Sequence, residues 1–139
     1  MQVIKAAKMT YRLGEKKHFT GTVQLDEITV KEFQADVKVY RVFFAPGART
    51  YWHTHQEGQV LHIVAGMGRI GTLRESMIEV GPDDVAYICP GEKHWHGAAP
   101  ERSMIHFATS PDNEGKDTGW GEEVTDDEYN GRVVRGVKP

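Results

Sequence analysis

Between residues 37 and 109 the chain alternates short apolar runs with turns rich in glycine and proline. The apolar runs are enriched in β-branched and aromatic residues, which favour strands. We expect a strand near 18–23 and eight more at 37–44, 51–56, 59–65, 69–73, 77–80, 85–89, 94–98 and 103–109. Many short strands at this spacing are typical of an all-β sandwich or barrel.

Only the C-terminal part of the chain offers a helix. Thr125 and Glu128 stand at the spacing of a capping box, which predicts a helix of about two turns at 125–129. Residues 131–139 are expected to form a loose end. The length of 139 residues fits a single domain that spans residues 1–139.

Composition excludes several classes of protein. A net charge of −3 lacks the basic surface of a nucleic-acid binder. The N-terminus has no apolar stretch long enough for a signal peptide, and no segment reaches the roughly 20 apolar residues of a membrane span. We therefore expect a cytoplasmic protein that binds neither nucleic acid nor membrane.

Cys89 is the single cysteine, so no internal disulfide can form, and we expect it to be a small buried residue.

The candidate chemistry lies in the histidines. His53 and His55 are separated by one residue, so on a strand both imidazoles point to the same side. Gln59 follows after a short loop, and His94 lies on a later strand. These four side chains are the predicted metal ligands. Three imidazoles and one amide oxygen form a neutral set, so a divalent ion keeps its full charge and acts as a stronger Lewis acid. Structural hydrogen bonding is the alternative role for each of the four.

Two further histidines share the expected inner face. His96 is two residues after His94, so on a strand it points to the same side. His106 lies in an alternating run with Met104 and Ala108. Packing is the alternative role for both. The other residues near the site are assigned away from it: Glu57 to the solvent, His62 to the outer face of its strand, and Trp52 and Trp95 to packing. Imidazoles suit zinc, copper, iron and nickel, and manganese when oxygen ligands are added.

These residues resemble the two motifs of the cupin superfamily. The first motif has glycine, His-x-His, glutamate and glycine, and its positions are filled by Gly47, His53, His55, Gln59 and Gly66. The second is matched by Gly81, Gly91 and His94, but Cys89 stands where proline is expected and Ala98 where asparagine is expected. The resemblance implies a double-sheet jelly-roll β-barrel with an internal metal, usually in a dimer or higher oligomer.

A narrower resemblance is to the small bacterial manganese-dependent cupin hydroxynitrile lyases. The matching segments are 46–50, 52–55, 58–59 and 90–100, and residues 19–23 and 124–126 also resemble that group, so the similarity covers most of the chain. In that family three histidines and a glutamine hold the metal, which matches His53, His55, His94 and Gln59. The resemblance implies manganese as the cofactor, a small-molecule substrate and a homo-oligomer, either a dimer or a tetramer.

The predicted function is therefore metal-dependent cleavage or formation of cyanohydrins, with the metal as Lewis acid and a histidine as base. His106 is the first candidate for the base and His96 the second. Two alternatives remain open. A cupin dioxygenase would use iron, copper or nickel to bring oxygen to an enol-type substrate, and a non-catalytic cupin would bind a metal and a small ligand without turnover.

Overall fold

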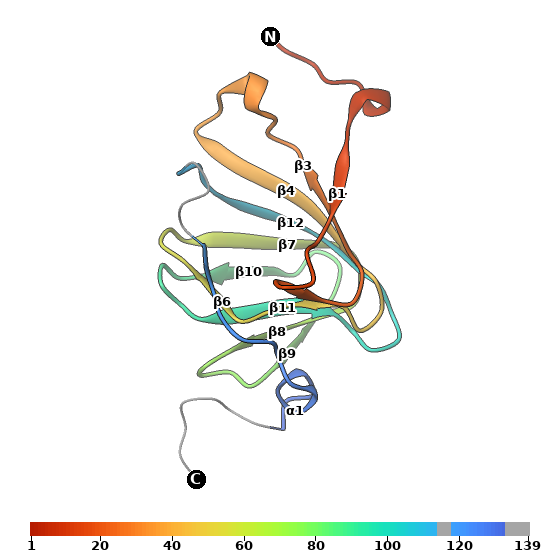
Figure 1. Cartoon of the computed structure of the whole chain (residues 1–139), viewed down its shortest axis with the longest axis vertical. Helices are drawn as coiled ribbons and strands as arrows, with labels where there is room; N and C mark the ends of the chain where they lie inside the picture. Colours follow the sequence, from red (N-terminus) through yellow and green to blue (C-terminus); the bar gives the residue numbers. More distant parts are fainter. Residues whose placement is uncertain (114–117, 133–139) are drawn as a thin grey trace.

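The computed structural model describes residues 1–113 and 118–132, and it consists mainly of two antiparallel β-sheets that face each other (Figure 1). The six-stranded sheet has the order β1 (Tyr11–Leu13), β3 (Val23–Glu27), β4 (Val37–Phe44), β12 (Met104–Pro111), β7 (Gln59–Gly66) and β10 (Val85–Ile88). The second sheet has the order β13 (Thr118–Trp120), β6 (His53–His55), β11 (His94–Ala98), β5 (Arg49–Thr50) and β2 (Phe19–Thr20), and β8 (Gly68–Thr72) pairs with β11 and β9 (Ile78–Val80). The predicted all-β double-sheet barrel is confirmed.

The core lies between the two sheets and follows the two-residue period of the strands. On β7, Leu61 and Ile63 are fully buried, whereas Val60 between Gln59 and Leu61 is exposed. On β12, alternate residues from Met104 to Ala108 are buried in the same way. Because successive strand side chains point to opposite faces, this alternation places every second residue inside the barrel. His62 lies on the outer face, as predicted.

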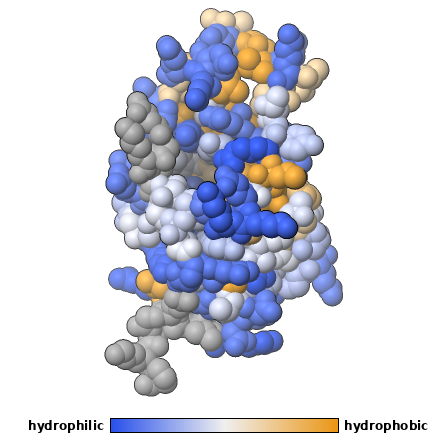
Figure 2. All heavy atoms as spheres, viewed as in Figure 1, coloured by the Kyte–Doolittle hydropathy of each residue, from blue (hydrophilic) through white to orange (hydrophobic). Residues whose placement is uncertain are grey.

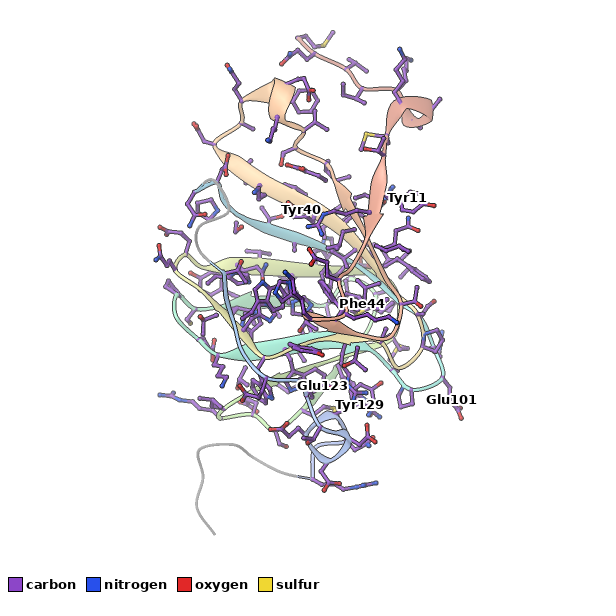
Figure 3. The ribbon with its side chains drawn as sticks, viewed as in Figure 1. Tyr11, Tyr40, Phe44, Glu101, Glu123 and Tyr129 are labelled. Carbon is purple, nitrogen blue, oxygen red and sulfur yellow. The ribbon has the colours of Figure 1, made fainter. Side chains whose placement is uncertain are left out.

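A smaller core joins the C-terminal helix to the second sheet. Trp52 and Trp95 are buried there with Val124 and Tyr129, which confirms their packing role. The helix α1 (Asp126–Tyr129) begins at the predicted capping box, but it is one turn long rather than two. Tyr129, labelled on α1 in Figure 3, donates its hydroxyl hydrogen to the carbonyl oxygen of Ala98 and so ties the helix to β11.

The eight strands expected between residues 37 and 109 are all present, with ends within two residues of the prediction. The N-terminal expectation was less accurate, because 18–23 is divided into β2 and the start of β3 by Gly21, whose φ is +78°. Strands β1, β5 and β13 were not predicted, and neither were the short 3-10 helices Ala6–Lys8 and Lys31–Phe33. No helix in the described ranges is long and apolar enough to cross a membrane.

The prediction for Cys89 was wrong, since the structure exposes this residue. Cys89 lies just beyond the last residue of β10, and it continues the outward-facing positions of this strand, since Val85 and Tyr87 are exposed as well. Of the predicted loose end, 133–139 lies outside the described residues, and Gly131 belongs to the turn that follows α1.

Candidate metal centre

Three of the predicted ligands meet because β6 and β11 are neighbouring strands. His53 and His55 point to the same side of β6, and the strand pairing sets His94 directly opposite His53. The ring centroids of His53 and His94 are 4.2 Å apart, those of His53 and His55 5.0 Å, and those of His55 and His94 5.4 Å. The two-residue period and the strand register therefore gather three imidazoles on one inner surface.

Hydrogen bonds fix how two of these rings are turned. Nδ1 of His53 lies 2.9 Å from the carbonyl oxygen of Tyr51, and Nδ1 of His94 lies 2.9 Å from the carbonyl oxygen of Glu92. A carbonyl oxygen only accepts, so each Nδ1 carries the hydrogen and each Nε2 keeps a lone pair. Outer partners of this kind orient histidines that bind metals through the other nitrogen.

Two buried polar atoms support a metal at this place. Nε2 of His94 and Oε1 of Gln59 are both buried, and neither has a hydrogen-bond partner among the described residues. An unpaired polar atom in the interior costs roughly 1–3 kcal/mol, so such atoms need a ligand or ordered solvent. A lone pair on an imidazole and one on an amide oxygen are both suitable for a divalent transition metal, and the residues present therefore fit the group.

One cluster of candidate donor atoms includes a histidine that was predicted as catalytic. One ring nitrogen each of His53, His94 and His96 lies within 4.8 Å of the others, and all three residues are buried. This buried histidine cluster has the form of a metal site. His55 is half-buried next to it, with Nδ1 3.4 Å from the hydroxyl oxygen of Thr118. Glu57, the rival oxygen donor, is exposed.

The two predicted catalytic histidines form a pair on the inner face. Nε2 of His106 lies 2.9 Å from Nδ1 of His96, and both side chains are buried. Phe44 packs against both, with ring-centroid distances of 5.8 Å to His96 and 5.3 Å to His106. His106 on β12 and His96 on β11 come from opposite sheets, so the hydrogen bond crosses the interior of the barrel.

Burial holds these imidazoles in the neutral form. It lowers the pKa of His94 and of His106 from 6.5 to about 4. The pKa values of His53 and His96 are also well below 6.5, first because of burial and second because neighbouring histidines oppose a positive charge. Near pH 7 the four rings are therefore uncharged, which is the form that can bind a metal or accept a proton.

The metal-free protein is expected to lose stability as the pH falls from about 6.5 to about 4. In this window the unfolded chain protonates its histidines while the folded chain excludes those protons, so acid favours unfolding. At 1.36 kcal/mol per pKa unit, His94 and His106 would each account for about 3 kcal/mol at the acid end. Urea unfolding of the chelator-treated protein between pH 7 and 5 measures this effect, and a midpoint that stays constant would contradict it.

The cluster opens into a cavity of about 450 Å³, within the usual range for small-molecule sites. His53, His55, Gln59, His96 and His106 line one part of it. The rest of the lining combines apolar and polar side chains. The apolar ones include Phe19, Leu25, Val42, Phe44 and Ala108, and the charged ones are Arg12, Glu15 and Lys38. The structure therefore brings three of the four predicted ligands and both histidines predicted for catalysis to one cavity, whose size suits a small substrate.

Two residues of this cavity were not predicted from the sequence. His18 stacks on Trp120 with a ring-centroid distance of 4.1 Å and an angle of 8° between the planes, and Trp120 lies 4.9 Å from His53. Trp120 is opposite His53 in the pairing of β13 with β6. No regular alternation marks the three-residue strand β13, and only the spatial pairing reveals that Trp120 lies against His53.

Two antiparallel sheets closed over a buried histidine cluster define a small metal-binding β-barrel. The sequence-family model of the cupin domain matches residues 40–107, which contain both histidine motifs. The chain is 41% identical over 129 residues to an (R)-mandelonitrile lyase from Granulicella tundricola, covering 93% of this chain and 98% of that enzyme. It therefore belongs to the cupin family, and the resemblance seen in its motifs is confirmed.

Solved structures agree with this assignment. A cupin-like protein from Thermotoga maritima has a TM-score of 0.80 and 33% sequence identity, and the match covers 91% of this chain and 94% of that chain. The polyketide cyclase RemF from Streptomyces resistomycificus has a TM-score of 0.74 at 16% identity, with 94% of this chain and 91% of that chain covered. The second likeness concerns the fold alone.

Proposed function

We propose that this protein is a metal-dependent lyase that cleaves and forms cyanohydrins, in which one carbon carries a hydroxyl and a nitrile group. The observation that carries the proposal is the 41% identity, over nearly the whole of both chains, to an (R)-mandelonitrile lyase. The buried histidine cluster and the cavity next to it are consistent with this chemistry. The products would be an aldehyde or ketone and hydrogen cyanide.

His53, His55 and His94 through Nε2, and Gln59 through Oε1, are the proposed metal ligands. The hydrogen bonds on Nδ1 of His53 and His94 and the buried oxygen of Gln59 support this set. Manganese is the proposed ion because the resemblance to the manganese-dependent cupin hydroxynitrile lyases implies it, and the oxygen donor of Gln59 is compatible with it. When bound, a divalent ion in this neutral set supplies Lewis acidity toward the substrate hydroxyl or nitrile.

The His96–His106 pair is the proposed base. Its shared hydrogen bond leaves one acceptor nitrogen: Nε2 of His96 when His96 donates through Nδ1, or Nδ1 of His106 when His106 donates through Nε2. That nitrogen takes the hydroxyl proton, the oxygen electrons form the carbonyl double bond, and the carbon–carbon bond to the nitrile breaks. The bonding electrons leave on the cyanide carbon, and the proton held by the pair is then returned to give hydrogen cyanide.

Apolar side chains of the cavity wall would contact the organic part of the substrate. Val42 and Phe44 on β4 and Ala108 on β12 lie beside the histidine pair and exclude water from it. Water exclusion strengthens the electrostatic interactions inside the site and keeps the transferred proton between the substrate and the pair.

The purified protein is expected to cleave mandelonitrile to benzaldehyde and hydrogen cyanide equally well in air and under argon. The reaction is a proton transfer with carbon–carbon cleavage, and it consumes no oxygen. Treatment with a chelator should abolish the activity, and added manganese should restore it. Turnover of an enol-type substrate that stops under argon would instead support the dioxygenase, and metal-loaded protein that binds benzaldehyde without any turnover would support the non-catalytic alternative.

A homo-oligomer, either a dimer or a tetramer, is the proposed assembly. Both edge strands of the six-stranded sheet expose large apolar side chains, Tyr11 and Leu13 on β1 and Val85 and Tyr87 on β10. Figure 2 shows hydrophobic atoms near the end of the molecule that carries the N-terminus. Exposed apolar edges favour association. Light scattering coupled to gel filtration tests this, and a monomer at micromolar concentration would contradict it.

A further inference from the structure

A row of four side chains on the inner face of β4 lines the cavity from its buried end to its mouth. Phe44, Val42, Tyr40 and Lys38 are alternate residues of this strand, and all four line the cavity. Phe44 and Val42 are buried, whereas Tyr40 and Lys38 are only half-buried. Figure 3 shows Phe44 near the middle of the barrel and Tyr40 further along β4, toward the end that carries the N-terminus. The side chains of this row therefore change from apolar to charged toward the solvent.

The neighbouring strand β12 pairs with β4, and each pair of inward-facing residues forms one layer of the cavity wall. His106 pairs with Val42, Ala108 with Tyr40 and Ser110 with Lys38. The layer of Lys38 and Ser110 is thus four residues above the layer of His106, a rise of about 13 Å at 3.3 Å per residue. Because the lysine side chain is long and flexible, its ammonium group can cover part of that distance.

Two positive charges at the mouth have no acidic partner in the described part of the chain. Lys38 and Arg12 both line the cavity, and neither forms an ion pair among residues 1–113 and 118–132. Glu15, the acidic residue of the same lining, has its carboxylate 3.3 Å from the ammonium group of Lys17. Nζ of Lys38 lies over the ring of Tyr40, another residue of the cavity wall, at 5.8 Å from the ring centroid.

We propose that the preferred substrates carry an anionic group, such as a carboxylate, at the end opposite the cyanohydrin carbon. This inference rests on the proposed function. Lys38 and Arg12 would bind the anion, with the hydroxyl of Ser110 as an additional donor. An aromatic ring between the reacting carbon and the carboxylate would lie in the layer of Tyr40 and Ala108. The overall charge of the chain is negative, so this local positive mouth is not a consequence of its composition.

The test compares the cleavage of 4-carboxymandelonitrile with that of mandelonitrile by the metal-loaded protein. We expect kcat/KM to be about fivefold higher for the carboxylate substrate, the size of one partly exposed ion pair. Lys38→Gln should remove most of this preference, and Lys38→Glu should reverse it in favour of a 4-aminomethyl substrate. The matched control is Lys8→Gln, which removes an exposed charge outside the cavity and should leave both rates unchanged.

A binding measurement separates this inference from the proposed function. Calorimetric titration of the protein with 4-carboxybenzaldehyde and with benzaldehyde requires no turnover. Tighter binding of the carboxylate, lost in Lys38→Gln, would support the anionic site even if no cyanohydrin were cleaved. Equal affinity for the two aldehydes, or equal kcat/KM for the two cyanohydrins in a protein that cleaves mandelonitrile, would overturn it. A Lys8→Gln protein with the same loss as Lys38→Gln would overturn it as well.

Discussion

Replacing His94 by alanine is expected to release the metal from the purified protein, whereas His96→Ala is expected to retain it. Nε2 of His94 is buried without a hydrogen-bond partner in the described chain, and Nδ1 is held by the carbonyl oxygen of Glu92. The ring is therefore prepared to donate to an ion. Loss of a ligand should weaken binding by at least the 10- to 100-fold seen when only an outer partner of a ligand is removed.

Metal content after dialysis against a weak chelator measures the effect directly. His62→Ala is the matched control, because it removes an imidazole from the outer face of β7 and should leave the metal content unchanged. Two results would contradict the ligand assignment. In one, His94→Ala binds as much metal as the unaltered protein; in the other, His96→Ala loses as much metal as His94→Ala, which would make His96 a ligand.

Replacing His106 by alanine is expected to lower kcat for mandelonitrile by about 100- to 10,000-fold while the metal remains bound. His106 is fully buried and contacts His96 through a 2.9 Å hydrogen bond, so its loss removes one member of the proposed base. The measurement is steady-state kinetics on protein with verified metal content.

His106→Gln separates proton transfer from positioning. The glutamine amide can still hydrogen-bond to His96, but it cannot accept a proton near pH 7. If the pair acts as the base through His106, this variant is as inactive as His106→Ala. If His106 only positions His96, the glutamine variant recovers most of the activity. Full activity in the alanine variant would remove His106 from the mechanism.

The long strands could be predicted because their apolar runs follow the two-residue period. β4 has the predicted ends, because its run of apolar and aromatic residues begins at Val37 and ends at Phe44. β11 has the predicted ends too, but all five of its residues are buried, so it does not show the alternation. β5 and β13 have two and three residues, too few for a pattern, and they exist because a neighbouring strand offers hydrogen-bonding partners. Cys89 shows a different error, because it continues the apolar run in sequence but takes the same outward-facing positions as Val85 and Tyr87.

The candidate site was predictable to the extent that parity determines it. His53 and His55 face the same side by strand geometry, and the same rule put His96 and His106 inside. Parity does not give the register that sets His94 opposite His53, nor the hydrogen bond between His96 and His106 from opposite sheets. These depend on how distant strands pair and pack.

The most direct test is an anomalous-difference map from crystals of the manganese-loaded protein. We expect one strong peak inside the barrel, in contact with Nε2 of His53, His55 and His94 and with Oε1 of Gln59. His96 and His106 should lie beside it without ligating it. A map without a peak in the barrel, or a peak held by His96 in place of His55 or with the amide of Gln59 turned away, would contradict the account.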